Sequence, residues 1–434
     1  MLARLEAYFE FERLGTNWKT EILAGATTFI TMAYIVFVNP SILHETGMPL
    51  AAVMAATCLC AAFGSILMGV FARYPIALAP GMGLNAYFTY TVVKGLGISW
   101  QAALGAVFLS GVAFLILTVA GVRQLIVEAI PAELYSAVAA GIGLFIAMIG
   151  LRNAGIVVAS PATLVALGNL RDKNTALALF GLIVTAALAA WGVRAAMLIG
   201  ILATTALGAA MGLVTWSPAS NPLSELAATA GKLDVRGALN LGFLEVVFVF
   251  LFVDLFDNVG TLVGVAKKAG LMDSAGHIPR MRRILLTDAT ATVAGSLLGT
   301  STVVSYIESA AGVVAGGRSG VTSIVTGLLF IAALFVAPVV GAVPTAATAP
   351  ALIIVGSLMM SHVGEIQWGD PAMAIPAFLT MATIPLTFSI ATGLSLGFTA
   401  YALLRLATGK ARETHWLVFV LAALFVARFV YLGQ

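Results

Sequence analysis

Long apolar runs separated by short polar stretches are the feature that most limits how this chain can fold. They recur from Ile22 to Tyr431, and 61% of the residues are hydrophobic while only 9% are charged. A soluble domain carries about a quarter charged residues. Runs of about 20 apolar residues cross a bilayer as helices, whereas a transmembrane barrel shows short alternating segments. The pattern predicts an all-α polytopic membrane protein, with the lipid bilayer as its surroundings and no nucleic-acid partner.

The apolar runs divide into two sets of seven, with a polar loop near 215–240 between them. The first set lies near 20–40, 51–72, 85–96, 98–121, 133–150, 175–191 and 195–214. The second set lies near 241–266, 284–299, 305–317, 319–340, 346–361, 371–388 and 390–407, and a further apolar segment covers 416–432. Because seven is odd, a second set that repeats the first must be inverted in the membrane. We therefore expect about fourteen transmembrane segments in two inverted repeats.

The placement of lysine and arginine predicts which side of the membrane each loop faces. With the N-terminus inside, most of these residues fall on the cytosolic side, led by the basic loop 267–283. Lys94, Arg152, Arg171 and Lys173 are among those that fall outside. This bias satisfies the positive-inside rule. We expect a cytosolic N-terminus, with residues 1–19 as an amphipathic lead-in near the membrane surface.

Two segments in corresponding places, third and tenth in order, are too short to cross about 30 Å of hydrocarbon as helices. They are GMGLNAYFTYTVVKG (81–95) and STVVSYIESAAGVVAGG (301–317), and both are bounded by glycine. Such a pair indicates the binding site of a transporter. If extended chain runs up to Gly83 and to about Ser305, the two following helices point their N-termini at the middle of the membrane. Asn85 and Glu308 then lie in their first turns.

Three acidic residues lie inside apolar segments, where each carboxylate costs about 2.5–3.5 kcal/mol. They are Asp254, Asp257 and Glu308, and no lysine or arginine inside the spans can serve all three. Asp254 and Asp257 are spaced i, i+3, and Asn258 and Thr261 continue the same helical face. This polar stripe predicts a wall of a watery cavity or a bundle interior. Asp257 with Asn258 also fits a hydrogen-bonded pair between packed helices.

The predicted site contains acidic side chains and an amide but no lysine or arginine, and this limits the chemical class of the ligand. Three carboxylates disfavour an anion, whereas a flat neutral molecule with several N–H groups can donate to them. The Asn85 amide can donate in turn to ring nitrogens or to a carbonyl. Carboxylates that interact this closely share protons, as a proton-coupled carrier requires. We expect such a carrier, with the proton on Asp254, Asp257 or Glu308 and with no resident cofactor or metal.

Other interpretations of the same residues stay open at this point. An inorganic-anion exchanger or channel can share the inverted-repeat architecture. An intramembrane aspartyl protease needs two acids meeting from separate helices, whereas Asp254 and Asp257 lie on one. A purely structural membrane protein leaves the paired short segments unexplained. Asp288, close to Arg282 and Arg283 in sequence, is expected as a cap or ion pair at the cytosolic edge.

Four stretches at these positions resemble a known family. They are TTFITMAYIVFVNPSIL (27–43), APGMGLNAYF (79–88), FVDLFDNVGTLVG (252–264) and SYIESAAGVVAGGRSGVTSIVTGLLF (305–330). They are similar to the signature blocks of the AzgA-like purine permeases, within the nucleobase–cation symporter-2 (nucleobase–ascorbate transporter) superfamily. The resemblance runs from about Thr16 to Gly409.

The resemblance implies the uracil-permease-like fold, in which a core domain moves against a gate domain. The implied divisions are core 20–121 and 241–340 and gate 133–214 and 346–407, after the lead-in 1–19. The extra apolar segment, within 408–434, exceeds the fourteen-span pattern and is expected either as a fifteenth span or as a segment along the membrane interface. It also implies import of hypoxanthine, guanine or adenine with protons across the inner membrane, by alternating access. The sequence does not determine the oligomeric state, and a homodimer is compatible with it.

The resemblance further implies which residues bind the substrate. The family's site positions fall on Gly83, Asn85, Asp254, Asp257 and Glu308, with backbone groups of Ser309 and Ala310 beside them. Thr28 and Thr31 add a polar face on the first span. Threonines in membrane helices also bond back to their own backbone, which is the competing interpretation for these two.

Overall fold

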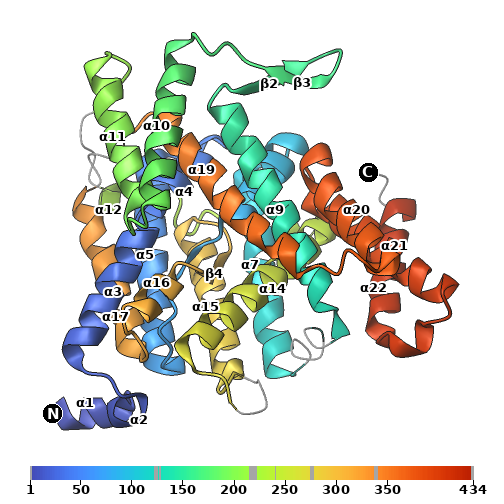
Figure 1. Ribbon diagram of the computed structural model, residues 1–434, viewed down its shortest axis with the longest axis horizontal. Coiled ribbons are helices and arrows are strands. Elements are labelled where there is room, and N and C mark those ends of the chain that lie inside the picture. The colour runs from blue at the N-terminus through green and yellow to red at the C-terminus, as the bar shows by residue number, and fades with distance from the viewer. Residues whose placement is uncertain are drawn as a thin grey trace.

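The computed structural model describes residues 2–121, 126, 129–214, 222–239, 241–273, 278–336 and 341–431. These residues form a bundle of packed helices, with the N-terminal helices at one end and a β-hairpin at the other (Figure 1). Parts of the loops 215–240 and 267–283, and the ends of the predicted segments 319–340 and 416–432, lie outside the described residues.

The first half of the chain runs to Ala210. Its elements are α1 (Leu2–Tyr8), α2 (Phe11–Leu14), α3 (Trp18–Met32), α4 (Ile35–His44), α5 (Leu50–Leu67), η1 (Met68–Ala72), β1 (Leu78–Pro80), α6 (Met82–Ala86), η2 (Tyr87–Gly95), α7 (Trp100–Val119), α9 (Ala132–Asn153), β2 (Val157–Ser160), β3 (Leu164–Leu167), α10 (Lys173–Ala190) and α11 (Ala196–Ala210). Both η1 and η2 are π-helices.

The second half of the chain follows the polar loop. Its elements are α12 (Pro222–Glu225), η3 (Leu226–Ala228), α13 (Val235–Ala238), α14 (Leu241–Ala269), α15 (Met281–Leu298), β4 (Val303–Ser305), α16 (Ser309–Val314), α17 (Gly320–Ala333), η4 (Leu334–Val336), α19 (Thr345–Met359), η5 (Met360–Glu365), α20 (Pro371–Thr387), α21 (Ile390–Ala407), η6 (Ala411–Glu413) and α22 (Trp416–Tyr431).

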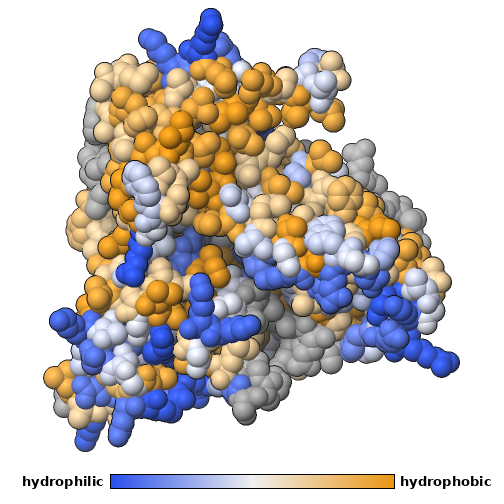
Figure 2. Space-filling model, viewed as in Figure 1, coloured by the Kyte–Doolittle hydropathy of each residue, from blue (hydrophilic) through white to orange (hydrophobic). Residues whose placement is uncertain are grey.

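The surface agrees with a membrane environment. Among the described residues, seven helical stretches are long and apolar enough to cross a membrane by length and composition. Figure 2 shows apolar residues covering the side formed by α10 and α11, where Ile183 is 66% exposed and Leu202 42% exposed. Hydrophilic residues gather around α1 and α2 at the opposite end. An exposed apolar helix face of this kind is stable against lipid rather than water.

The extended chain that leads into each short helix crosses the other inside the bundle, as a pair of antiparallel strands. In this pairing of β1 with β4, Leu78 is opposite Ser305 and Pro80 is opposite Val303. Two further backbone bonds extend it, from Gly81 N to the Thr302 carbonyl (2.9 Å) and from Tyr306 N to the Ala77 carbonyl (3.0 Å). Non-helical backbone survives at membrane depth only where protein buries it, and every residue of both strands is buried. The prediction of extended chain before each short helix is confirmed, but the first extended stretch ends at Gly81 and not at Gly83, because α6 begins at Met82.

The same hydroxyl brace holds the start of each strand. The Ser65 hydroxyl of α5 donates to the Leu78 carbonyl (3.1 Å) and accepts from the Leu78 N–H (2.9 Å). The Thr292 hydroxyl of α15 donates to the Val303 carbonyl and accepts from its N–H, both at 3.1 Å. The braced groups cannot bond within a two-stranded ladder alone, so each hydroxyl satisfies a buried donor and acceptor. One device thus occurs once in each half of the chain.

The extra apolar segment forms α22, which packs along α21 at the C-terminal end of the bundle (Figure 1). The Phe425 ring lies 5.5 Å from Phe248, 6.2 Å from Phe252 and 5.7 Å from Phe398, measured between ring centroids. Edge-on aromatic contacts at these separations are favourable. The helix is therefore anchored to the same α14 that carries the acidic stripe.

A buried carboxylate ties the first span to the helix after the second short segment. The Glu21 carboxylate of α3 is fully buried. It accepts hydrogen bonds from the Arg318, Ser319 and Thr322 backbone N–H groups and from the Thr322 and Thr16 hydroxyls. It thus caps the N-terminus of α17, whose free N–H groups have no helical partner. The carboxylate sets the position of α17 relative to α3.

We expect Glu21→Ala to destabilise the protein by roughly 3 kcal/mol, because several buried N–H groups lose their acceptor at once. The measurement is the thermal unfolding midpoint of the purified protein in detergent. The control is Glu12→Ala, since Glu12 is exposed on α2. Equal midpoints for Glu21→Ala and the unaltered protein would show that this carboxylate does not hold the two helices together.

Candidate functional site

The candidate site lies where the crossed strands lead into two short helices. Gly81 ends the first extended segment and α6 begins at the next residue, with Asn85 inside it. Glu308 is the residue before α16 and occupies its N-cap position. Both α6 and α16 pack against α14, the helix that carries Asp254 and Asp257. The crossing thus gathers the predicted site residues from three parts of the chain.

Glu308 is held by a tyrosine from the first span. The Tyr34 hydroxyl donates to Glu308 Oε1 at 2.7 Å. Tyr34 lies in the short break between α3 and α4 and is 1% exposed, whereas Glu308 is half-buried. A carboxylate that keeps accessible surface while one oxygen is fixed has the second oxygen available to a ligand. Tyr34 therefore positions the acid through its hydroxyl.

Asp257 lies on the other side of the first short segment. It is half-buried, and a Cβ added to Gly81 would lie 3.5 Å from Asp257 Oδ2 and 2.9 Å from Val304 Cγ2. A glycine at this position therefore lets the backbone approach the acid. The charge of Asp257 interacts first with that of Asp288 and then with that of Glu308. Asp257 and Glu308 form the half-buried group among these acids.

Asp254 lies apart from that group, in a buried network. The Asn258 amide donates to Asp254 Oδ1 at 2.5 Å and to Asp288 Oδ2 at 3.0 Å, and its oxygen accepts from the Ser305 N–H at 2.8 Å. Asp254, Asn258 and Asp288 are all fully buried. Asn258 thus links the acidic stripe of α14 to α15 and to the last residue of β4.

Asp288 is the residue that sequence reasoning missed. The expectation that it caps or pairs at the cytosolic edge is wrong, because it lies in the interior of α15 and bonds Asn258. Proximity in sequence to Arg282 and Arg283 was misleading. The available signal was its place within an apolar span, the same signal that identified Asp254 and Asp257.

Asn85 carries a buried donor that the protein leaves open. The Ser301 hydroxyl donates to Asn85 Oδ1, and both residues are fully buried. Asn85 Nδ2 has no hydrogen-bond partner among the described residues. An unsatisfied buried amide N–H costs about 1–3 kcal/mol, so a ligand or water that accepts from it is favoured.

Gly83 serves packing. A Cβ at this position would lie 2.5 Å from Ile142 Cγ2 of α9. Glycine is therefore needed for the close contact between α6 and α9, whatever else approaches its backbone.

Two of the remaining predicted residues form hydrogen bonds that stabilise the fold. The Thr31 hydroxyl donates to the Thr27 carbonyl of its own helix at 2.8 Å. Ser309 Oγ accepts from the Ala77 N–H at 3.0 Å and so supports the strand crossing. Ala310 is buried within the bundle. Thr28 is fully buried beside Gly312 of α16, and its hydroxyl has no hydrogen-bond partner among the described residues. The carboxylates of Asp257 and Glu308, the Asn85 amide and the Thr28 hydroxyl are therefore the predicted polar groups that remain available.

The described residues offer no group of three histidine, cysteine, aspartate or glutamate side chains placed to hold a metal ion. Both Cys58 and Cys60 are buried and form no disulfide, and they pack as small side chains. The chemistry of the site thus consists of carboxylates and an amide, which accept and donate hydrogen bonds.

Sequence comparison places the chain among known transport proteins. A model described as "Permease family" matches residues 19–396. The chain is 45% identical to the adenine permease AdeP of Escherichia coli (strain K12), covering 99% of this chain and 96% of that protein. It is 47% identical to the guanine/hypoxanthine permease PbuG of Bacillus subtilis (strain 168), covering 99% of this chain and 100% of that protein.

Comparison of structures gives the same kind of fold. The transmembrane domain of the cyanobacterial bicarbonate transporter BicA superposes with a TM-score of 0.65, covering 88% of this chain and 97% of that one. The sequences are only 14% identical, so this likeness concerns the fold alone.

We expect Asn258→Ala to destabilise the protein by about 3 kcal/mol, because two buried carboxylates lose the donor between them. If the carboxylates cause the effect, Asp288→Asn should relieve part of it, and the double variant should be less destabilised than the sum of the single variants. The measurement is the thermal midpoint of the four proteins in this cycle.

The matched control for that cycle is Asn39→Ala. Asn39 is another fully buried amide, bonded to the Thr57 and Thr300 hydroxyls (2.7 and 3.1 Å) outside the acidic network. Its effect should add to that of Asp288→Asn. Strict additivity in both cycles would count against the shared-amide network.

Proposed function

The chain belongs to the AzgA-like purine permeases of the Permease family, and on that premise we propose that it imports purine nucleobases together with protons. It is a multi-pass membrane transporter and not an enzyme. The crossing of β1 with β4 carries the proposal, because it gathers two half-buried carboxylates and an open amide donor beside two short helices. Hypoxanthine, guanine and adenine are the candidate substrates.

The donors and acceptors of a purine match those of the site. Ring N–H groups and exocyclic amines of the base donate to the carboxylates of Glu308 and Asp257, which keep accessible surface. Asn85 Nδ2 donates to a ring nitrogen or carbonyl of the base and so gains the partner it lacks in the protein. Asp254 acts from behind, through Asn258 and β4.

Proton coupling is supported by the grouping of the acids. The charge of Asp257 interacts with those of Asp288 and Glu308, and neighbouring carboxylates in a low-dielectric site disfavour ionisation together. Asp257 and Glu308 are the pair that keeps accessible surface. One proton shared by the pair moves with the base, and the co-transported proton takes the place of any cofactor. Tyr34 keeps Glu308 in place through this exchange.

The proposed architecture is fourteen spans in two inverted repeats of seven. It is supported by the hydroxyl brace that occurs once in each half, at Ser65 and at Thr292. In this architecture the core holds α3 to α7 and α14 to α17, the gate holds α9 to α11 and α19 to α21, and α22 is an extra segment. Alternating access is then a movement of core against gate. The protein lies in the inner membrane with its N-terminus in the cytosol, in keeping with the positive-inside rule.

We expect Glu308→Ala and Asp257→Ala each to reduce uptake of labelled hypoxanthine, guanine or adenine roughly a hundredfold, because a charged acceptor is worth about 2–3 kcal/mol. Asp254→Ala should also abolish uptake, by releasing Asn258. The control is Glu413→Ala, since that side chain is 66% exposed. Wild-type uptake in membrane-inserted Glu308→Ala protein would break the assignment.

Competition by each unlabelled nucleobase ranks the substrates and tests the substrate class. A protonophore should abolish accumulation, because the proton gradient drives the import. Uptake that ignores both the protonophore and an imposed pH gradient would rule out proton coupling. Chloride or bicarbonate currents without nucleobase uptake would favour an inorganic-anion exchanger of the same fold.

A further inference from the structure

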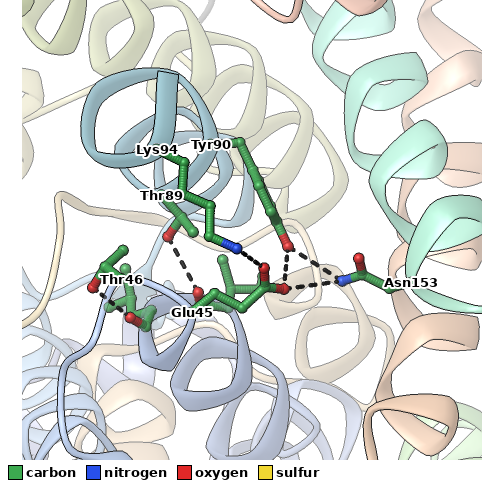
Figure 3. A network of polar contacts seen from close by, with 8 residues as sticks. Glu45, Thr46, Thr89, Tyr90, Lys94 and Asn153 are labelled. Carbon is green, nitrogen blue, oxygen red and sulfur yellow. Dashed lines mark hydrogen bonds and ion pairs between the residues drawn. The ribbon is translucent and has the colours of Figure 1, made fainter. Parts of the chain in front are cut away.

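A cluster of polar residues joins three parts of the bundle at the end that carries the β-hairpin. It consists of Glu45, Tyr90, Lys94 and Asn153, shown in Figure 3. Glu45 follows α4, Tyr90 and Lys94 belong to η2, and Asn153 ends α9. We call these four residues the latch.

The Glu45 carboxylate is the centre of the latch. The Tyr90 hydroxyl donates to Glu45 Oε1 at 2.6 Å, and Lys94 forms an ion pair with Oε2. Asn153 Nδ2 donates to Glu45 Oε1 at 3.4 Å and to the Tyr90 hydroxyl at 3.2 Å. Asn153 is thus the residue through which α9 binds the other two elements (Figure 3).

A second set of contacts joins η2 to α9 and α20 beside the latch. The Thr91 hydroxyl donates to the Phe388 carbonyl at 2.6 Å, where α20 ends in a left-handed residue. The Arg152 guanidinium lies 4.9 Å from the Tyr90 ring centroid and 6.0 Å from that of Phe388. Cation–π contacts at these distances are attractive. The Thr91 bond and the Arg152–Tyr90 contact therefore connect η2 with helices assigned above to the gate, and the Arg152–Phe388 contact joins two of those helices.

An apolar seal lies between the latch and the candidate site. Ile142, Ile146 and Ile149 share one face of α9 with Asn153, at helical spacing, and each is at most 2% exposed. Gly83 of α6 packs against Ile142 and Ile146. The face of α9 that carries the latch thus also covers the short helix that holds Asn85.

We propose that the latch holds the Lys94 end of the transport pathway closed in this conformation and must part in every cycle. The inference rests on the proposed alternating access. The movement that opens this end separates α9 from η2 and α4, and therefore breaks both Asn153 bonds. Polar contacts near the surface can break and re-form at little cost. The Glu45 and Lys94 side chains are 26% and 42% exposed, so water can take the place of Asn153 when α9 moves away. A contact made of apolar side chains alone would have no hydrogen bonds that water could replace on opening.

The test measures access to the seal by a membrane-impermeant thiol reagent. Ile149→Cys is introduced in a background with Cys58→Ser and Cys60→Ser, and the reagent is applied from the Lys94 side without substrate. Tyr90→Phe removes the hydroxyl that bonds Glu45 and Asn153 but keeps the ring. We expect labelling of the introduced cysteine to become roughly fivefold faster, because the neutral hydrogen bond from Asn153 to the Tyr90 hydroxyl, which opening breaks, no longer favours the closed state.

The matched control is Tyr74→Phe. The Tyr74 hydroxyl, from an equally buried tyrosine at the opposite end, donates to the Pro279 carbonyl within the core. It should leave the labelling rate unchanged. Asn153→Ala is the second variant, and it should accelerate labelling as Tyr90→Phe does. With two variants, the test still gives a result if one of them folds poorly.

Unchanged labelling in whichever latch variant folds would overturn the proposal, and so would equal acceleration by Tyr74→Phe. Because no nucleobase is present, the result is independent of the proposed substrate. Faster labelling together with absent purine uptake would support the latch and count against the proposed function. Normal purine uptake with unchanged labelling would support the proposed function and count against the latch.

Discussion

The antiparallel pairing of β1 with β4 is the contact on which the rest of the structure depends. Extended backbone at membrane depth is tolerated only when its polar groups are bonded, and here each strand satisfies the other. The Ser65 and Thr292 hydroxyls bond the groups that the pair leaves over. Because the strands end in the middle of the bundle, α6 and α16 begin there. The available polar groups of Asn85, Asp257 and Glu308 follow from this crossing.

Two kinds of polar contact serve different ends. The Asn258 network and the Glu21 cap are fully buried, so losing one partner leaves others without water and is expensive. The Asn258 network fixes α14, α15 and β4 relative to one another, and the Glu21 cap fixes α17 relative to α3. The Glu45 latch is partly exposed, so its bonds exchange with water at little cost. Rigid contacts thus lie within the proposed core, and exchangeable ones lie between core and gate.

The sequence predicted the membrane class, the paired short segments and the acidic stripe, because apolar runs and their interruptions are local patterns. Extended chain before α6 and α16 was predicted for the same reason and is confirmed. The division of labour among the acids was not predictable. Asp254 is buried in a network with Asn258 and Asp288, whereas Asp257 keeps accessible surface. Asp288 lies 30 positions from Asn258 along the chain, so no local pattern shows this difference. The latch joins residues up to 108 positions apart, beyond any local pattern.

The most direct test of the account is a structure of the protein with a bound purine. The crossing of β1 and β4 predicts that the base lies between α6 and α16, with Glu308 accepting from one of its N–H groups and Asn85 Nδ2 donating to a ring nitrogen or carbonyl. A base bound elsewhere, with Glu308 and Asn85 both without contact to it, would contradict the claim that the strand crossing builds the binding site.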